Sequence, residues 1–572
     1  KNIITLNDML ANYKNLIKYG FTPGQIAMIQ KNGLTLDNLK YDPYIKLCSR
    51  GVHIKTVDAY LVNEQKLMPY DVKRLSGFVY DALLTARNNG NTCIRFDALL
   101  KRVNHRLKEF GVYNNKIDLT LLNAMIIHLR SRASYYDYDD DMYVYLNNVK
   151  NEEDKVVYHL ERLKNAARPL NTDVISPEKI GKETGLTYNE GQIKAFDLLK
   201  KSGVKILTGP PGSGKTAVIN GLIRYFTEND NGNVVLAATT GRAAKVMSSA
   251  CHDEAKTLHK LLGIMPYDHE VASGIFIPQK VEADLVIVDE VSMMGLQIMS
   301  NLVSCLKSGS TLLFVGDEDQ LQSVEYGNIL HDLIASESIE VCRLTEILRQ
   351  SGTICENAAK INKGRNDLVI NNDKFLVYNC QDNEHALEKF KEYYKEQNSQ
   401  VLCPVKKGEI STFSLNCLLQ KKEGEVLMMN SGKEFRKGDK VIITKTNYND
   451  ELDCKDYRNG DIGYINCRLK NGDIDIVFDD LRHVIFSKSE FQNLDLAYAI
   501  TIHKSQGSEF DDVHILLPSG ADRMMTRRLL YTAVTRAKKH VYIYAVGRTL
   551  DHAIQNLGEN ARSTLLSERI RN

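Results

Sequence analysis

One short segment constrains the fold of this chain more than any other. Residues 209–216 read Gly-Pro-Pro-Gly-Ser-Gly-Lys-Thr, directly after an apolar run and before a helical Ala-Val-Ile-Asn sequence. Glycines let backbone N–H groups close around phosphates, and the N-terminus of the following helix adds favourable partial charge. In such a loop, Lys215 reaches the β- and γ-phosphates and Thr216 holds Mg²⁺. The sequence therefore predicts a phosphate-binding loop made of Gly209, Pro210, Pro211, Gly212, Ser213, Gly214, Lys215 and Thr216.

Short apolar runs on both sides of this loop predict the fold class. Residues that are apolar at consecutive positions are typical of parallel strands covered on both faces by helices. The stretches between the runs are long enough for helical crossovers, which predicts doubly wound α/β domains. One set of runs lies at 206–207, 234–237, 285–288 and 312–315, and a second set at 401–402, 514–517 and 541–544.

The remaining sequence predicts two parts of a different kind. Residues 1–185 read as short helical segments without a long buried strand, and we expect the acid- and tyrosine-rich segment 135–141 to be a solvated loop or a helix start. Residues 430–490 alternate like strands, with hairpin-like turns at Asn459-Gly460 and Asn471-Gly472, which is typical of a small β-barrel. We expect a helical domain (1–185), a first α/β domain (186–341) and a second (342–572) that carries the barrel.

Composition excludes several classes of protein. No run approaches the ~20 apolar residues of a membrane span, and the N-terminus lacks the apolar stretch of a signal peptide, so we expect a cytoplasmic protein without a membrane partner. The chain begins with Lys1 rather than Met, which suggests a trimmed chain. The net charge is only +2, so a nucleic acid would have to bind along a local stripe of positive charge. The eleven cysteines include no CxxC pair that would indicate zinc or a redox couple.

Two adjacent acids follow the third apolar run. Asp289 and Glu290 come directly after residues 285–288, and ligands of such sheets bind at the carboxyl ends of the strands. Asp289 is therefore a candidate ligand for Mg²⁺, and Glu290 is a candidate base for an attacking water molecule. Alone, an Asp-Glu pair after a strand is also a common helix N-cap. Its place beside a phosphate-binding loop favours the catalytic interpretation.

Three further side chains are candidates to act on a bound triphosphate. Gln320 follows the run 312–315, where it can sense the γ-phosphate or orient water, although the same segment fits an ordinary turn. Arg349 and Arg536 offer the positive charge that ATP hydrolysis needs on the γ-phosphate in the transition state. Spacing alone does not single out these two arginines, because most arginines lie on the surface.

The order of these motifs resembles that of superfamily 1 helicases of the RecD-like branch, in the self-contained form rather than as a subunit of a nuclease complex. The resemblance implies two RecA-like doubly wound parallel-sheet motor domains, a helical N-terminal domain with helix–hairpin–helix-like segments, and an inserted SH3-like β-barrel. The matching segments are 186–192, 209–216, 236–244, 257–259, 289–293, 316–324, 497–510 and 531–537.

The resemblance also implies roles for individual residues. Gln192 would read the adenine, Glu509 would approach the ribose, and Arg349 and Arg536 would be arginine fingers. For His259 and His503, a packed and hydrogen-bonded core position is the alternative. The residues expected to follow the backbone of single-stranded DNA are Thr240, Arg242, Thr257, His259, Thr501, His503 and Lys504.

The chain departs from the family pattern at several positions. Residues 42–58 resemble its helix–hairpin–helix segment, but Arg50 stands where the hairpin usually has a first glycine, which puts direct DNA binding there in doubt. Thr239 and Gln322 stand where the family commonly has proline. Residues 264–280 correspond to a short hairpin that the family uses as a pin, with an ordinary surface loop as the alternative.

Together, the resemblance implies an ATP- and Mg²⁺-dependent DNA helicase that moves 5′→3′ along single-stranded DNA and unwinds duplex at junctions, acting as a monomer. A single-strand-binding protein is a candidate partner. Two alternatives stay open: a translocase that displaces proteins without processive unwinding, and a nucleotide-dependent DNA-binding switch. The residues do not exclude RNA as a substrate, and they do not distinguish replication, repair and recombination.

Overall fold

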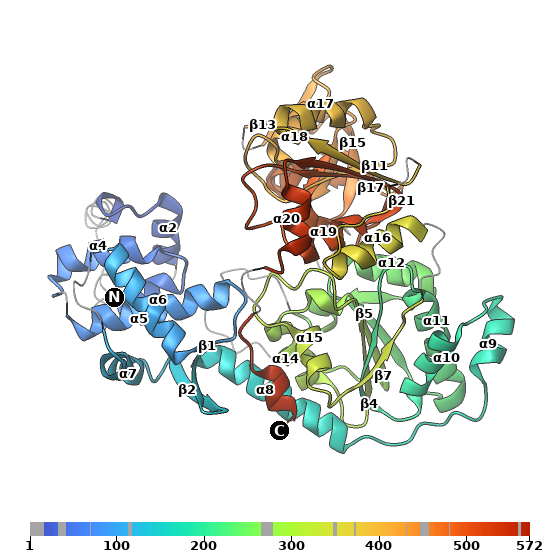
Figure 1. The fold of residues 1–572 in the computed structure, drawn as a ribbon, viewed down its shortest axis with the longest axis horizontal. Coiled ribbons are helices and arrows are strands. Elements are labelled where there is room, and N and C mark those ends of the chain that lie inside the picture. Colours follow the sequence, from blue (N-terminus) through green and yellow to red (C-terminus); the bar gives the residue numbers. More distant parts are fainter. Residues whose placement is uncertain are drawn as a thin grey trace.

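Figure 1 shows the computed structural model, which describes residues 16–31, 42–68, 70–111, 117–264, 278–346, 352–370, 373–430, 432–446, 457–479, 481–558 and 562–571. A mainly helical part at the N-terminus is followed by two α/β units, each built around a parallel sheet. The predicted α/β class is therefore confirmed. Among the described residues, no helix has the length and apolar character needed to cross a bilayer.

The first α/β unit is built on a six-stranded parallel sheet in the order β6-β5-β7-β8-β4-β9. Its strands are β4 (Gly203–Thr208), β5 (Val234–Ala238), β6 (Ala255–Thr257), β7 (Leu285–Asp289), β8 (Thr311–Gly316) and β9 (Glu340–Arg343). Its helices are α10 (Glu190–Phe196), α11 (Lys215–Asp230), α12 (Gly241–Cys251), α13 (Leu258–Leu261), α14 (Leu296–Cys305) and α15 (Ile329–Ala335).

The consecutive apolar residues of β7 explain why helices cover both faces of this sheet. Leu285 and Ile287 join the core that α11 and α12 cover, whereas Val286 and Val288 join the core that α14 and α15 cover. Successive side chains of a strand point to opposite faces, so an unbroken apolar run needs a hydrophobic partner on each side. The four apolar runs predicted as strands here are confirmed as β4, β5, β7 and β8.

The second unit repeats this architecture with a five-stranded parallel sheet in the order β10-β21-β20-β11-β19. Its strands are β10 (Phe375–Cys380), β11 (Ser399–Cys403), β19 (Ala499–Thr501), β20 (Phe510–Leu517) and β21 (Ala537–Val546). Helices α16 (Gly352–Asn362), α19 (Arg527–Val534) and α20 (Thr549–Gln555) share one core with the sheet. Helices α17 (Asn383–Tyr393) and α18 (Thr412–Leu419) share the core on its other face.

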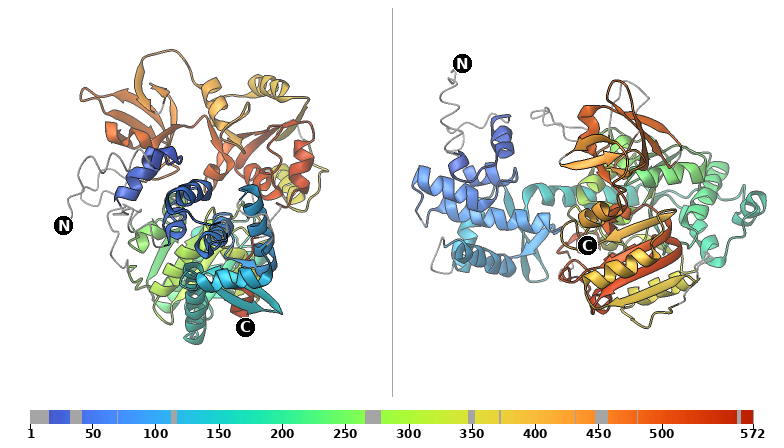
Figure 2. Two further views of the ribbon diagram at one scale, coloured as in Figure 1. Left: turned by 90° about the vertical axis from the view of Figure 1, so that its left-hand side faces the viewer. Right: turned by 90° about the horizontal axis from the view of Figure 1, so that it is seen from above.

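Antiparallel strands are inserted between β11 and β19, and Figure 2 shows them beside the second parallel sheet. A hairpin of β12 (Val426–Asn430) and β13 (Lys433–Arg436) comes first, and the five-stranded sheet that follows has the order β17-β16-β15-β14-β18. The predicted turn at Asn471-Gly472 joins β15 to β16. Closure of these strands into an SH3-like barrel stays a prediction. The sheet contains β14 (Lys440–Ile443), β15 (Ile462–Arg468), β16 (Ile474–Phe478), β17 (His483–Phe486) and β18 (Leu494–Leu496).

The N-terminal part is mainly helical but also contains a three-stranded sheet in the order β1-β3-β2. The expectation that residues 135–141 form a loop or a helix start is wrong, because they lie in an antiparallel hairpin of β2 and β3. Asp139 and Asp140 both have positive φ (51° and 61°), as a two-residue type I′ turn requires. The elements are α2 (Pro23–Lys31), α3 (Pro43–Cys48), α4 (Ile54–Gln65), α5 (Val72–Asn88), β1 (Cys93–Arg95), α6 (Phe96–Glu109), α7 (Leu119–His128), β2 (Ala133–Tyr138), β3 (Asp141–Leu146), α8 (Asn147–Asn165) and α9 (Pro177–Thr184).

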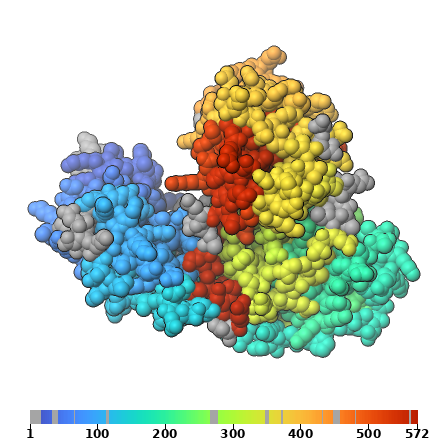
Figure 3. Space-filling model, viewed as in Figure 1, coloured from blue at the N-terminus to red at the C-terminus, as the bar shows by residue number. Residues whose placement is uncertain are grey.

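The two predicted domain boundaries of the second α/β unit do not coincide with the packing. The division between residues 341 and 342 falls inside β9, which belongs to the first sheet. At the other end, α21 (Leu566–Arg571) leaves the second unit and packs against α8 and α15. Figure 3 shows this dark red segment between the N-terminal part and the first α/β unit. Arg569 of α21 forms an ion pair with the fully buried Glu153 of α8, with 3.0 Å between Nη1 and Oε2.

Candidate functional site

The predicted phosphate-binding loop lies between β4 and α11, at the carboxyl edge of the first sheet. Gly212 and Gly214 adopt positive φ angles of 84° and 82°, which side chains rarely tolerate. At Gly209, a Cβ atom would come within 2.7 Å of the carbonyl oxygen of Leu344. The Nζ of Lys215 donates hydrogen bonds to the carbonyls of Gly209 (2.6 Å) and Pro210 (3.1 Å), so its ammonium lies inside the curve of the loop. These glycines are required to form a tight cradle of backbone amides.

Gln192 lies against the same loop. Its Nε2 donates to the carbonyl of Ser213 (3.3 Å), and its Oε1 accepts from the backbone N–H of Asn189 (3.1 Å). With Asn189, Gln192 forms the capping box of α10, which places this short helix beside the loop. The side chain is buried.

Asp289 and Glu290 lie at the carboxyl end of β7, as predicted. Glu290 adopts a left-handed conformation (φ 56°), which costs a non-glycine residue about 1 kcal/mol and is characteristic of functional sites. Its backbone is held on both sides: its N–H donates to Oδ1 of Asp289 (2.7 Å), and its carbonyl accepts from the hydroxyl of Thr239 (3.0 Å). Thr239, which stands where the family commonly has proline, therefore makes a hydrogen bond that proline cannot make.

The electrostatic surroundings of the two acids favour proton uptake. Burial raises the pKa of Asp289. Burial, and then the neighbouring Asp289 carboxylate, raise the pKa of Glu290 to about 7, while the cations of Arg536 and Lys215 act in the opposite direction. A carboxylate with such a pKa can accept a proton near neutral pH.

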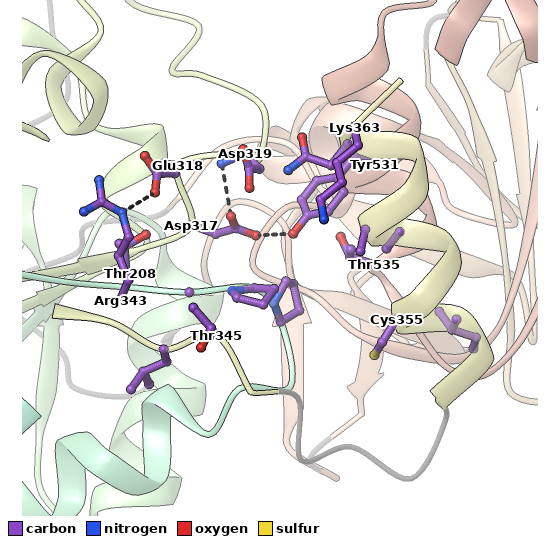
Figure 4. A pocket seen from close by; sticks show the side chains of 18 of the residues that line it. Thr208, Asp317, Glu318, Asp319, Arg343, Thr345, Cys355, Lys363, Tyr531 and Thr535 are labelled. Carbon is purple, nitrogen blue, oxygen red and sulfur yellow. Dashed lines mark hydrogen bonds and ion pairs between the residues drawn. The ribbon is translucent and has the colours of Figure 1, made fainter. Parts of the chain in front are cut away.

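The loop after β8 contacts the second α/β unit, and Figure 4 shows its Asp317 pointing toward Tyr531 of α19. The buried Asp317 accepts hydrogen bonds at Oδ2 from the hydroxyl of Tyr531 (2.9 Å) and from Nε2 of Gln320 (3.2 Å). The backbone N–H of Leu321 donates to the hydroxyl of Thr532 (3.0 Å). The Oε1 of Gln320 is buried and has no hydrogen-bond partner among the described residues. This acceptor is therefore free to bind a water molecule or ligand.

A cavity of about 310 Å³ lies between the phosphate-binding loop and the second unit. Gly209 and Pro211 line it from the first unit, and Lys363 of the segment after α16 and Tyr531 of α19 line it from the second. A nucleotide in the loop would therefore contact both units.

Arg536 follows α19 and is buried. Its Nη1 donates to the carbonyl of Ser508 (3.1 Å) and its Nε to the carbonyl of Thr532 (3.1 Å). Its charge acts on the pKa of Glu290, so the guanidinium faces the same site from the second unit. Arg349 lies outside the described residues, as do residues 265–277 of the predicted pin. Glu509 forms an ion pair with Lys538, two residues after Arg536, at 3.9 Å.

Three of the residues predicted to contact DNA are threonines at helix starts. The hydroxyls of Thr240, Thr257 and Thr501 accept backbone N–H bonds as the N-caps of α12, α13 and the 3₁₀ helix Ile502–Ser505. His259 is half-buried and His503 is exposed, so neither is the packed core histidine that was the alternative. These residues are therefore held at the carboxyl edges of the two sheets.

Arg242 has a different environment from the other predicted DNA contacts. Its guanidinium lies 5.4 Å from the centre of the Phe510 ring, a cation–π distance between the two units. Burial lowers the pKa of Arg242, and the carboxylates of Asp479 and Asp461 act in the opposite direction. The structure therefore places Arg242 against the second unit and the inserted sheet.

Sequence reasoning did not identify Asp317, Tyr531 and Thr532 as functional residues. Asp317 and Tyr531 are separated by 214 positions, and neither segment carries a signal that the two side chains meet. The contact is visible only in the folded structure, where Asp317 and Tyr531 are both buried and lie side by side.

The fold and the site define a P-loop nucleotide-binding protein with two α/β units facing one cleft. A family profile described as an AAA domain matches residues 187–379, and one described as a UvrD-like helicase C-terminal domain matches residues 496–544. The "ATP-dependent RecD2 DNA helicase" of Deinococcus radiodurans is 32% identical over 411 residues, which cover 70% of this chain and 54% of that protein. The "RecBCD enzyme subunit RecD" of Mycobacterium tuberculosis is 28% identical over 472 residues, covering 71% of this chain and 76% of the subunit.

These comparisons confirm the predicted resemblance: the chain is similar in sequence to helicases of the RecD type. It spans about half the length of the Deinococcus protein. Among solved structures, Bacteroides Pif1 bound to single-stranded DNA is 20% identical, with a TM-score of 0.42 over 64% of this chain and 94% of that chain.

Proposed function

We propose that the chain is an ATP-dependent DNA helicase that translocates 5′→3′ on single-stranded DNA and unwinds duplex. One observation carries the catalytic part of this proposal: the charges of Lys215 from the first unit and of Arg536 from the second both act on the pKa of Glu290. Direction of movement follows from the resemblance to the RecD-like branch. We also propose three domains, with the first motor domain ending after Arg343, and action as a monomer.

The residues of the cleft fit a magnesium nucleotide. The glycine cradle leaves no room for a Cβ at Gly209, and the ammonium of Lys215 lies inside it. Thr216 and Asp289 would hold Mg²⁺, which would neutralise charge on the phosphates. Gln192 would bind the adenine and Glu509 the ribose.

We assign the chemical step to three kinds of side chain. Glu290, at its carboxylate, accepts a proton from the attacking water, and its raised pKa suits this role. Gln320 orients that water through Oε1, the acceptor without a partner among the described residues. Arg536, together with Arg349, stabilises the charge that develops on the γ-phosphate, as arginine fingers do.

Movement on DNA follows from the contacts between the two units. Because Asp317 bonds Tyr531 and Leu321 bonds Thr532, a change at the loop beside the γ-phosphate reaches α19 directly. We propose that opening and closing of the cleft moves DNA along the carboxyl edges of the sheets. The proposed DNA contacts are Thr240, Arg242, Thr257, His259, Thr501, His503 and Lys504.

The test is steady-state ATP hydrolysis with and without single-stranded DNA, followed by unwinding of matched duplexes with a 5′ or a 3′ single-stranded tail. We expect DNA-stimulated hydrolysis and unwinding of the 5′-tailed duplex only. Unwinding of the 3′-tailed duplex would overturn the proposed direction. Hydrolysis without unwinding would favour a translocase, and DNA binding without turnover would favour a nucleotide-dependent switch.

A further inference from the structure

A groove of about 570 Å³ lies on the second α/β unit, where strands β11 and β19 end. Its walls are the segment after β11, helix α18, the β12–β13 hairpin and the 3₁₀ helix Ile502–Ser505 after β19. It shares no lining residue with the cavity beside the phosphate-binding loop. Thr501 and Lys504, which were predicted to contact DNA, both line it.

Positive charge is concentrated around this groove. Four lysines line it, namely Lys406, Lys407, Lys433 and Lys504, against the two acids Glu434 and Asp495. Lys433 is neutralised by Asp495 at 2.6 Å. In the described part of the chain, the other three lysines form no ion pair. Burial lowers the pKa of Lys504, the carboxylate of Asp495 acts in the opposite direction, and the ammonium groups of Lys406 and Lys433 lower it further. An anion in the groove would relieve this repulsion.

An aromatic ring projects among these lysines. Phe413, in the first turn of α18, lines the groove and is 55% exposed. Its backbone N–H donates to the carbonyl of Lys406 (3.4 Å), which ties the ring's position to the lysine-bearing segment. A single exposed hydrophobic side chain needs no explanation by itself. A phenyl ring surrounded by ammonium groups is the combination with which proteins bind single-stranded nucleic acid.

The floor of the groove is rigid. Asn416 of α18 is buried and exchanges two hydrogen bonds with the backbone of Ala499 in β19, each 2.9 Å long. Gln420, at the end of the same helix, donates to the carbonyl of Glu434 in the hairpin (2.8 Å). The helix that carries Phe413 is therefore fixed to the strand that leads to Thr501.

We propose that Phe413 stacks on one unpaired base of single-stranded DNA while Lys406, Lys407 and Lys504 contact the flanking phosphates. This inference rests on the proposed function and deepens it, because it names the part of the DNA that the second unit holds. Every base has a π-face, so the contact carries no sequence preference. It would hold the strand by a base as well as by phosphates.

The absence of tryptophan from the whole sequence makes a direct test possible. A Phe413→Trp variant carries one tryptophan, whose fluorescence is quenched when a base stacks on it. We expect quenching at saturating concentrations of a short oligothymidylate. An oligonucleotide of the same length with abasic sites has the same phosphates, and we expect it to bind without quenching. Leu418→Trp is the matched control, because Leu418 lies on the same helix, is 42% exposed and does not line the groove. Its fluorescence should not change.

Affinity measured by fluorescence anisotropy gives a second readout. Phe413→Ala should weaken binding of oligothymidylate by about tenfold, which corresponds to the loss of one base–aromatic stack. The same variant should bind the abasic oligonucleotide with wild-type affinity, and Phe413→Tyr should restore binding of oligothymidylate. Saturating DNA binding without quenching of the tryptophan emission in Phe413→Trp, or an equal loss on both oligonucleotides in Phe413→Ala, would overturn the proposal. Absence of all DNA binding by the wild-type chain would overturn the proposed function as well.

Discussion

The contact between Tyr531 and Asp317 predicts how strongly the two units are coupled. Tyr531→Phe removes one hydroxyl, whose bond to the Asp317 carboxylate is 2.9 Å long and buried. A hydrogen bond to a charged group contributes about 1.5–3 kcal/mol. Asp317 keeps two other donors, Nε2 of Gln320 (3.2 Å) and the backbone N–H of Asp319 (3.0 Å), so we expect the lower end of this range. If the variant destabilises the closed arrangement of the two units by about 1.5 kcal/mol, kcat should fall about tenfold.

The assay is DNA-stimulated ATP hydrolysis, with urea denaturation as a measure of stability. Tyr498→Phe is a matched control, because the Tyr498 hydroxyl bonds the buried Asp439 at the same distance of 2.9 Å, and both residues belong to the second unit or its insertion. Both variants should lose similar stability, but only Tyr531→Phe should lower kcat. Equal kcat values in the two variants would refute the idea that this bond couples the units.

Four further outcomes follow from the structure. Glu290→Gln should retain ATP and DNA binding but lower turnover by about 100-fold or more, because it removes the general base; wild-type ATPase would reject this assignment. Arg536→Ala should lower DNA-stimulated kcat by ~10³-fold, and a loss confined to single-strand affinity would instead place it on the DNA path. Burial lowers the pKa of His514 to about 3, so only the unfolded chain takes up this proton as the pH falls below about 6.5. Stability should therefore decrease by about 2 kcal/mol between pH 6.5 and pH 5 through this group, and the urea midpoint of His514→Gln should depend less on pH than that of the wild type; parallel profiles would contradict this. Arg569→Met should leave the buried Glu153 without its cation and lower stability by ~3 kcal/mol, which an unchanged urea midpoint would exclude.

Much of the architecture follows from local patterns in the sequence. Apolar runs such as 285–288 and 312–315 become buried parallel strands because each successive side chain needs a hydrophobic partner on its own face of the sheet. The loop at 209–216 was predictable for a similar reason, since a cradle of backbone amides needs glycine at positions 212 and 214. The hairpin of β2 and β3 was missed because its two-residue turn uses aspartates rather than the Asn-Gly pair that most strongly signals such a turn.

The sequence alone determined the nucleotide-binding loop, the acids after β7 and the two-sheet fold, because each depends on residues that are neighbours in the chain. Only the tertiary structure decided what meets across the cleft. Tyr531 bonds Asp317, Arg242 packs on Phe510, and Phe413 lies among lysines from three separate segments. No local pattern specifies such contacts, because they depend on how two separately folded sheets and an insertion come to pack against one another, and that packing is a property of the whole chain.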